Sequence, residues 1–378
     1  MSEAFRFING HVVVADQLWR GAEIVVTGDR IASIRPLDEG ARDCVDLDGG
    51  WVMPGFIDTQ VNGGGGVLFN DDTDVDGIAA ITAAHARYGT TALLPTLISD
   101  SPERIALALD AVDAAIDAGV PGVVGVHIEG PFLNVARKGI HDAARFRLLD
   151  AAMVDLLARP RRGVVMVTLA PELAQLDDIA RLAAAGVRVS AGHTEASYDT
   201  ALAAFDAGLA GVTHLFNAMP AMVQRKPGLV GAALDDPRPW CGLIVDGVHV
   251  APAVLRIALR ARGIERMMLV TDAMSSVGAK DKDFVLQGRR IRVRDGICSY
   301  EDGTLAGSDL DMAAAVANAM GMLGLEPVVA ARLAAGNPAA FLGLEAERGT
   351  LAVGLRADWV QLTGAMVPVA TTIGGKTA

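Results

Sequence analysis

Eight short apolar runs alternate with alanine-rich segments through the middle of the chain, and this alternation limits the possible folds more than any other feature. Runs rich in Val, Ile, Leu and Met predict strands buried on both faces, and the longer alanine-rich segments predict helices. Strands and helices that alternate in this way form a parallel sheet covered by helices, so eight units predict an α/β fold, a (β/α)8 TIM-like barrel. The predicted strands are residues 51–57, 92–96, 123–128, 164–169, 187–191, 211–214, 242–245 and 267–271.

The two ends of the chain predict a second, smaller domain. Short strand-like runs separated by turns fill residues 5–50, and a similar pattern returns in residues 349–362. We therefore expect residues 1–50 and 346–378 to build one small β-sandwich domain together. The barrel domain is then expected to span residues 51–345.

Two segments interrupt the predicted barrel. Apolar and polar residues alternate around Gly288 and Gly296, and this pattern predicts a hairpin insertion near residues 283–300. Residues 219–227 lack apolar periodicity and predict a long loop. Long loops in compact domains often carry function, so this loop is a candidate contributor to a site.

Charge and cysteine content exclude several classes of protein. The 378 residues include 45 acidic and 33 basic side chains, a net charge of -12, which argues against a nucleic acid or an anionic membrane surface as partner. Residues 1–6 lack the start of a signal peptide, and no apolar run could span a bilayer, so we expect a cytoplasmic protein. Three widely spaced cysteines argue against both a disulfide framework and a zinc-thiolate site.

Polar residues follow several predicted strands, at the end where TIM barrels carry their active sites. Glu129 ends the third strand, and His193 and His214 end the fifth and sixth. One carboxylate and two imidazoles leave an open position for water, as catalytic zinc sites do, so the sequence predicts one divalent metal here. Zinc is the expected ion, although iron, cobalt and manganese suit the same ligands. Asp272, after the eighth strand, is the candidate general base and then general acid.

Each of these residues also has an ordinary explanation. A single histidine is more often a hydrogen-bonded core residue than a ligand, and a glutamate after a strand is more often a cap or a surface charge. Three ligand-type residues at the ends of three different strands are harder to explain in this way. We therefore retain the metal site as the leading hypothesis.

Five motifs, in register along nearly the whole chain, resemble those of the N-acetylglucosamine-6-phosphate deacetylase family, within the amidohydrolase superfamily. The resemblance implies hydrolysis of N-acetyl-D-glucosamine 6-phosphate to D-glucosamine 6-phosphate and acetate, a step of amino-sugar catabolism and recycling. Hydroxide bound to the metal would attack the acetamide, and Asp272 would act as base and acid. The motifs are Pro-Gly-Phe-Ile-Asp at 54–58, His-Ile-Glu-Gly-Pro at 127–131, Gly-His-Thr at 192–194, Thr-His-Leu-Phe-Asn-Ala-Met at 213–219 and Thr-Asp-Ala-Met at 271–274.

The same resemblance implies roles for residues that spacing alone leaves open. His141 would bind the acetamide carbonyl of the substrate and help to stabilise the oxyanion. Asn217, Ala218 and Arg225 would hold the 6-phosphate, for which arginine is well suited. His249 would be supplied to the neighbouring subunit's site, which implies a homodimer. The ordinary alternatives are a surface histidine for the first, a solvated loop cation for Arg225, and for His249 a histidine that serves its own barrel.

One difference from the superfamily bears on metal number. Many members carry two histidines after the first strand for a second metal, whereas this chain has Gln60 and Asn62. Neutral amides are poor ligands for a zinc-like ion beside imidazole, so we expect one metal per subunit. A weak second-metal site or a substrate contact stays open for these two residues.

Two other functions stay open. The enzyme could deacetylate N-acetylgalactosamine 6-phosphate or a related acetamide, because the sequence does not distinguish the epimers. A non-catalytic scaffold barrel belongs to another class, and it would be expected to have lost one or more of the proposed ligands or Asp272. All four residues are present.

Overall fold

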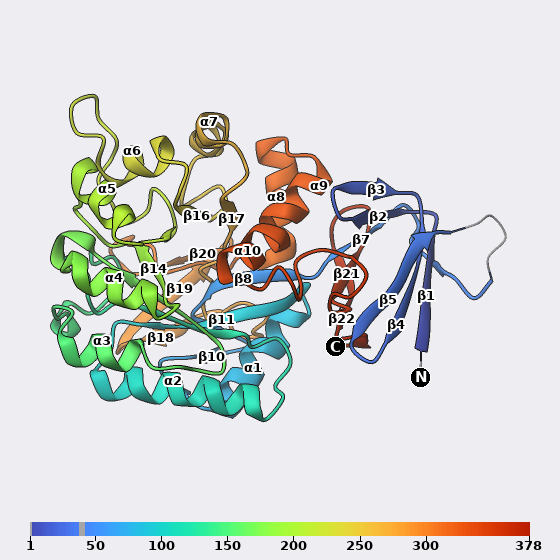
Figure 1. Ribbon diagram of the computed structural model, residues 1–378, viewed down its shortest axis with the longest axis horizontal. Helices are drawn as coiled ribbons and strands as arrows, with labels where there is room; N and C mark the ends of the chain where they lie inside the picture. Colours follow the sequence, from blue (N-terminus) through green and yellow to red (C-terminus); the bar gives the residue numbers. More distant parts are fainter. Residues whose placement is uncertain (1, 38–41) are drawn as a thin grey trace.

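The computed structural model describes residues 2–37 and 42–378, and its central element is an eight-stranded parallel sheet (Figure 1). Each strand pairs with the next in chain order. A parallel bridge joins Val61, in the first barrel strand, to Ala273, just after the last one, so the sheet nearly closes on itself. The predicted (β/α)8 barrel is confirmed. Its strands are β8 (Phe56–Val61), β11 (Thr90–Ile98), β12 (Gly125–Glu129), β13 (Val164–Leu169), β14 (Arg188–Ala191), β15 (Gly211–Val212), β16 (Trp240–Leu243) and β17 (Met267–Leu269).

The first predicted strand, residues 51–57, is wrong because it joins two strands of different sheets. β7 (Trp51–Pro54) pairs with strands at the two chain ends, and only β8 belongs to the barrel. Gly55 separates them, and an added Cβ there would collide with the side chain of Thr91. Both strands are buried, so their apolar composition does not mark the change of sheet.

Helices cover the outside of the barrel, and many begin at side chains that accept a hydrogen bond from the first helical turn. The capping residues are Asp74, Ser101, Asp150, Ser197 and Asp311. Figure 1 shows the helices arranged around the strands. They are α1 (Val75–Ala86), α2 (Pro102–Asp117), α3 (Ala151–Leu157), α4 (Leu176–Ala184), α5 (Tyr198–Asp206), α6 (Gly228–Asp235), α7 (Pro252–Arg262), α8 (Met312–Leu323), α9 (Pro327–Ala331) and α10 (Asn337–Leu342).

Strands from both chain ends form the small β-sandwich domain, as predicted. One sheet has the order β5-β4-β1-β6 and the other β23-β22-β21-β7-β2-β3. In Figure 1 the red strands β21 and β22 lie beside the blue strands β4 and β5. The exact domain bounds stay a prediction, and β7 leads us to propose Gly55 as the start of the barrel. The strands are β1 (Ser2–Ile8), β2 (His11–Val14), β3 (Gln17–Trp19), β4 (Ala22–Thr27), β5 (Arg30–Pro36), β6 (Val45–Asp46), β21 (Trp359–Leu362), β22 (Pro368–Ile373) and β23 (Lys376–Thr377).

The insertion near residues 283–300 forms three antiparallel strands, one more than the predicted hairpin. They are β18 (Phe284–Leu286), β19 (Arg289–Arg294) and β20 (Ile297–Ser299). Apolar side chains of this sheet pack against the loop β9 (Gly63–Gly64) to β10 (Val67–Leu68) and against the ends of the barrel strands. The inserted sheet therefore lies at the end of the barrel where β11 and β12 finish.

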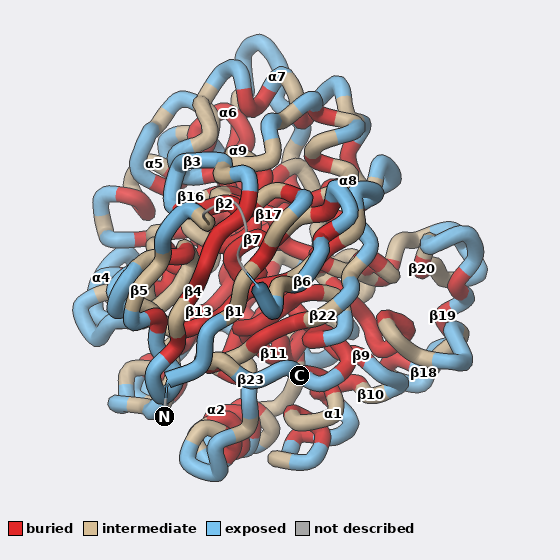
Figure 2. The backbone as a smooth tube through the Cα atoms, turned by 90° about the vertical axis from the view of Figure 1, so that its right-hand side faces the viewer, coloured by how far each residue is buried: buried red, intermediate tan, exposed pale blue. Residues whose placement is uncertain are grey.

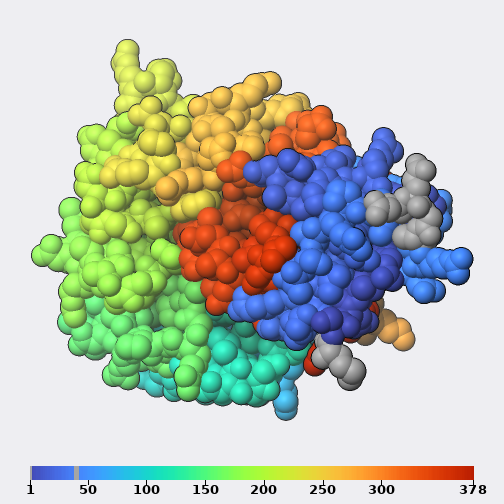
Figure 3. All heavy atoms as spheres, turned by 45° about the vertical axis from the view of Figure 1, so that its right-hand side comes forward, coloured from blue at the N-terminus to red at the C-terminus, as the bar shows by residue number. Residues whose placement is uncertain are grey.

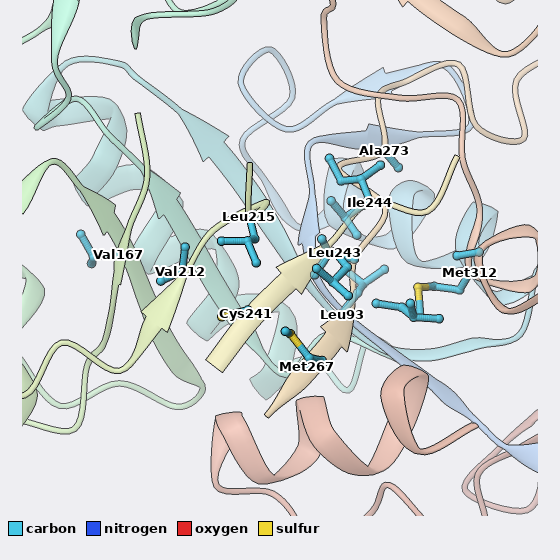
Figure 4. Close-up of a cluster of buried hydrophobic side chains, with 14 of the residues drawn as sticks. Leu93, Val167, Val212, Leu215, Cys241, Leu243, Ile244, Met267, Ala273 and Met312 are labelled. Atoms are coloured by element: carbon cyan, nitrogen blue, oxygen red, sulfur yellow. The ribbon is translucent and has the colours of Figure 1, made fainter. Parts of the chain in front are cut away.

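The barrel strands are almost entirely buried. All residues of β11 and all but the first residue of β13 are buried, and Figure 2 shows buried segments in red inside a surface of pale-blue loops and helix faces. Figure 4 shows side chains of neighbouring strands meeting in this core, among them Leu93, Leu243 and Met267. The three cysteines are free, as predicted. Within residues 2–37 and 42–378, every helix is too short or too polar to cross a bilayer.

Replacing Leu243 by alanine is expected to lower the free energy of unfolding by about 2–5 kcal/mol, because the fully buried side chain would leave a cavity. The same substitution at Leu107, which is 46% exposed on α2, is the matched control and is expected to be nearly neutral. Urea unfolding of both variants followed by circular dichroism measures the difference. Equal destabilisation of the two variants would contradict the packing described here.

Candidate functional site

Glu129, His193 and His214 converge at the carboxyl ends of the barrel strands. His214 Nε2 lies 3.1 Å from Glu129 Oε1 and 3.1 Å from His193 Nε2, and His193 Nε2 lies 3.3 Å from Glu129 Oε1. A tetrahedral zinc ion bound at about 2.0–2.2 Å places neighbouring ligand atoms about 3.3–3.6 Å apart. Among the residues that the structure describes, these three form a buried group able to hold a metal, as predicted.

The tautomer of His193 supports this interpretation. Its Nδ1 lies 2.8 Å from the carbonyl oxygen of Arg137, and a carbonyl can only accept, so Nδ1 carries the proton. In the neutral ring Nε2 then directs a lone pair toward the Glu129 carboxylate, which is unfavourable unless a cation lies between them. A carbonyl partner on the second ring nitrogen is typical of metal-binding histidines. The residues present therefore fit a divalent metal.

Strained backbone conformations gather around this group. His193, His214 and Asp272 have φ values of 49°, 33° and 54°, and Phe216 and Ala218 also have positive φ. Each such conformation costs a non-glycine residue roughly 1–3 kcal/mol, and such strain clusters at functional sites. The strain lets each strand end in a side chain that turns into the barrel mouth.

Gln60 and Asn62 place their amide nitrogens, not their oxygens, on the carboxylates of the site. Gln60 Nε2 lies 3.2 Å from both carboxylate oxygens of Glu129 and 3.1 Å from Asp272 Oδ1, and Asn62 Nδ2 lies 2.7 Å from Asp272 Oδ1. These nitrogens donate to the carboxylate oxygens, while the buried Oδ1 of Asn62 has no hydrogen-bond partner. The amides connect the metal-ligand carboxylate to the candidate base.

Asp272 is buried beside this amide pair. Both donated hydrogen bonds reach Oδ1, which leaves Oδ2 for the cavity. Burial raises the pKa of Asp272 above its ordinary value, and the nearby charge of Glu129 raises it further. A carboxyl group that titrates closer to neutrality can both take up and return a proton at physiological pH.

His141 is held as a neutral hydrogen-bond donor. The backbone N–H of Ser99 donates to His141 Nδ1 at 3.3 Å, and the Ser99 hydroxyl lies 2.8 Å from the same nitrogen. Because Nδ1 accepts, the proton of the neutral ring is on Nε2. Burial lowers the pKa of His141 well below its ordinary value, so the ring is uncharged near pH 7. The ring lies edge to face with His193, 4.5 Å between centroids.

These side chains surround a single cavity of about 400 Å³. Its size suits a monosaccharide. The predicted site residues that line it are Asn62, Glu129, His141, His193, His214, Asn217, Ala218, His249 and Asp272. Gln60 lies behind this wall, in contact with two of the lining carboxylates.

Two residues to which the resemblance gives roles lie in different surroundings. His249 lines the cavity of its own chain, where its Nδ1 lies 2.6 Å from Asp246 Oδ2 and only 8% of its side chain is exposed. Arg225 is exposed in the loop before α6 and does not line the cavity. The sequence gives the position of a loop but not the direction in which it leaves the barrel.

Sequence analysis missed one charged residue of the wall. Arg137 lines the cavity from the short helical turn Val135–Arg137, and its guanidinium pairs with Glu195. A signal was available, since Arg137 lies between the motif that contains Glu129 and His141. Thr304 and Leu305, beyond the inserted sheet, also line the cavity and lacked any recognisable pattern.

Comparisons with known proteins agree with this geometry. Residues 51–378 match the amidohydrolase family. The chain is 43% identical to the N-acetylgalactosamine-6-phosphate deacetylase of Shewanella sp. (strain ANA-3), covering 87% of this chain and 84% of that protein. It is 37% identical to the N-acetylglucosamine-6-phosphate deacetylase of Mus musculus, covering 98% and 93%. The crystal structure of the N-acetylglucosamine-6-phosphate deacetylase from Pasteurella multocida superposes over the full length of both chains, with a TM-score of 0.94 and 32% identity.

A second buried carboxyl group, Asp58, lies below the site. Its side chain accepts hydrogen bonds from the Thr271 hydroxyl at 2.5 Å and from the backbone N–H of Gln60 at 3.2 Å. Burial raises the pKa of Asp58 to about 7 despite these hydrogen bonds. The group therefore holds the segment next to Asp272 in place and makes the stability of the fold depend on pH.

Asp58→Asn is expected to remove part of that pH dependence. Between the unfolded pKa of about 3.9 and the folded pKa of about 7, the folded chain binds more protons, so wild-type stability falls with rising pH by at most about 1.4 kcal/mol per unit. Asparagine has the same shape and does not titrate. Urea unfolding from about pH 4 to about pH 7 should show the variant gaining stability relative to wild type as pH rises. Parallel curves would contradict the assignment.

Proposed function

The chain belongs to the amidohydrolase family, and on that premise we propose that it hydrolyses the acetamide of N-acetyl-D-glucosamine 6-phosphate to D-glucosamine 6-phosphate and acetate. The observation that carries this proposal is the meeting of Glu129, His193 and His214 with Asp272 and His141 around one cavity. The names of the relatives support the substrate, because proteins that align with nearly the whole chain are deacetylases of this phosphosugar.

We assign the chemistry as follows. A divalent ion at the two histidines and Glu129, one per subunit and with zinc as our first choice, would supply Lewis acidity and lower the pKa of a bound water. Asp272 takes the proton of the attacking water through Oδ2. His141 donates its Nε2–H to the carbonyl oxygen as negative charge develops there. When the carbon–nitrogen bond breaks, Asp272 returns the proton to the departing amine.

Arg137 is our candidate for the partner of the phosphate within the chain. Among the described residues of the cavity wall, it alone carries a permanent positive charge. Its Nε faces Glu195, which leaves the two terminal nitrogens of the guanidinium for an anion. Guanidinium binds phosphate oxygens through charge-assisted hydrogen bonds. Asn217 and Ala218 line the same cavity and would complete the phosphate site.

We further propose a homodimer in which Arg225 of one subunit reaches the phosphate site of the other. Figures 1 and 3 show the yellow-green segment before α6 projecting from the barrel, and Arg225 is exposed there. His249, which lines its own cavity, would then contact the sugar in its own subunit. A cytoplasmic location stays a prediction.

The epimer N-acetylgalactosamine 6-phosphate is the second candidate substrate. The relative from Shewanella, which carries that name, is 43% identical to this chain. The reaction and the roles proposed above are the same for both epimers. Comparing kcat/KM for the two phosphosugars in one assay decides between them.

Purified protein is expected to release acetate from N-acetyl-D-glucosamine 6-phosphate, to lose this activity on chelation and to regain it with one metal ion per chain. An enzyme-coupled acetate assay and metal analysis of the same samples measure both quantities. Asp272→Asn should keep the metal while losing about 10²–10⁴-fold in turnover. A fully metallated wild type that releases no acetate would contradict the proposed substrate, and metal loss in the variant would make Asp272 a ligand.

Arg137→Ala is expected to raise KM for the phosphosugar about 10- to 100-fold, the factor that corresponds to losing about 1.5–3 kcal/mol from hydrogen bonds to a charged group. Activity on unphosphorylated N-acetylglucosamine should change little. Glu195→Gln is the matched control, because it removes the carboxylate partner and keeps the guanidinium. An equal loss on both substrates would show that the Arg137 side chain supports the site as a whole and does not act on the phosphate.

A further inference from the structure

We propose that Gln287, at the tip of the inserted sheet, is a positioning residue for His141. The inference rests on the proposed function, because it assigns to the insertion a part in stabilising the oxyanion. Gln287 joins β18 to β19 and comes from a segment far from His141 in sequence. Its side chain nevertheless contacts both chain segments that hold the His141 ring.

The two ends of the Gln287 amide make two different hydrogen bonds. Nε2 donates to the carbonyl oxygen of Ser99 at 3.1 Å, and Oε1 accepts from the backbone N–H of Asp142 at 3.1 Å. Ser99 is the residue whose N–H and hydroxyl hold Nδ1 of His141, and Asp142 follows His141 directly. The Gln287 side chain therefore connects Ser99, which holds the His141 ring, to Asp142, the residue after His141. We call this pair of hydrogen bonds the clamp.

Apolar packing acts in the same direction. Ile98, which precedes Ser99, and Ile140, which precedes His141, both pack in one cluster with Leu286 and Ile291 of the inserted sheet. Each of the two segments that position His141 thus has an apolar contact and a hydrogen bond to the insertion. Small displacements of a catalytic donor are costly, since about 1 Å can reduce turnover about 10²-fold.

The backbone of Gln287 points to a function beyond turn formation. Gln287 and Gly288 have φ values of 49° and 77°, the conformation of a two-residue turn with both central residues left-handed. Such turns favour Asn, Asp or Gly at the first position, and glutamine is not among them. The next turn of the same sheet has the favoured pair, Asp295 and Gly296, with φ values of 52° and 77°. Glutamine, which the turn does not favour, therefore occurs at the position from which its long side chain reaches Ser99 and Asp142.

The substitution Gln287→Asn tests the two hydrogen bonds of the side chain separately from the conformation of the turn. Asparagine suits the left-handed position better, so the fold should be as stable as wild type, but its side chain is one methylene too short to keep both hydrogen bonds. We expect kcat for acetate release to fall about five- to tenfold, a fraction of the about 10²–10³-fold that an oxyanion donor supplies. KM and metal content should stay within about twofold of wild type. Asp295→Asn, the same residue in the equivalent turn, is the matched control and should change none of these values.

Two further measurements test whether the effect passes through His141. In a His141→Ala background, Gln287→Asn should lower kcat less than twofold, because the positioned group is gone. Hydrogen exchange of the Asp142 amide, which loses its acceptor, should be faster in Gln287→Asn and unchanged in Asp295→Asn. The inference is overturned if kcat is unaffected, if the full loss persists without His141, or if exchange at Asp142 stays slow. A wild type without deacetylase activity overturns the proposed function instead, while the exchange result still decides the clamp.

Discussion

Two imidazole nitrogens and one carboxylate oxygen lie within 3.3 Å of one another in a buried site, and the rest of the site is organised around keeping them there. Burial alone would raise the pKa of Glu129, but its close contacts with the His193 and His214 side chains hold it well below its ordinary value. The partner His214 has its pKa raised in return, because the contact with Glu129 outweighs its own burial. The three side chains together therefore favour a bound positive charge. A proton on His214 supplies that charge in part, and a divalent ion in its place would contact all three side chains.

The barrel supplies the rigidity that such a cluster needs. The three side chains come from the ends of β12, β14 and β15, and every residue of β12 is buried, so Glu129 has little freedom to move. His193 and His214 have left-handed backbone conformations, which are energetically unfavourable but orient their side chains toward the site. That strain is tolerated because the strands before them are fixed by parallel hydrogen bonds on both sides. Backbone conformations that would be unfavourable in isolation are therefore stable here, because burial of the apolar core supplies the free energy that offsets their cost.

The sequence predicts the parts that follow from periodicity and strand ends, and not the parts that depend on loop direction. Glu129 could be predicted because a buried strand must end at the mouth of the barrel. The change of sheet at Gly55 could not, because β7 and β8 are equally apolar. No local sequence pattern shows that His249 faces its own cavity and that Arg225 faces outward. Gln287 lies beyond sequence reasoning, since its two hydrogen bonds link segments more than a hundred residues apart.

The amide pair supports our proposal of one cation per subunit. A second ion beside the first would compete with the hydrogen bonds that the Gln60 and Asn62 nitrogens donate to Glu129 and Asp272. Turning either amide to present its oxygen would place that oxygen against a carboxylate, an unfavourable contact in a buried site. The two N–H groups thus partly replace the charge that a second metal would bring, and they do so while leaving Asp272 Oδ2 unbonded. A second metal would bind that carboxylate directly and compete with its proton, whereas the amides leave it able to exchange one.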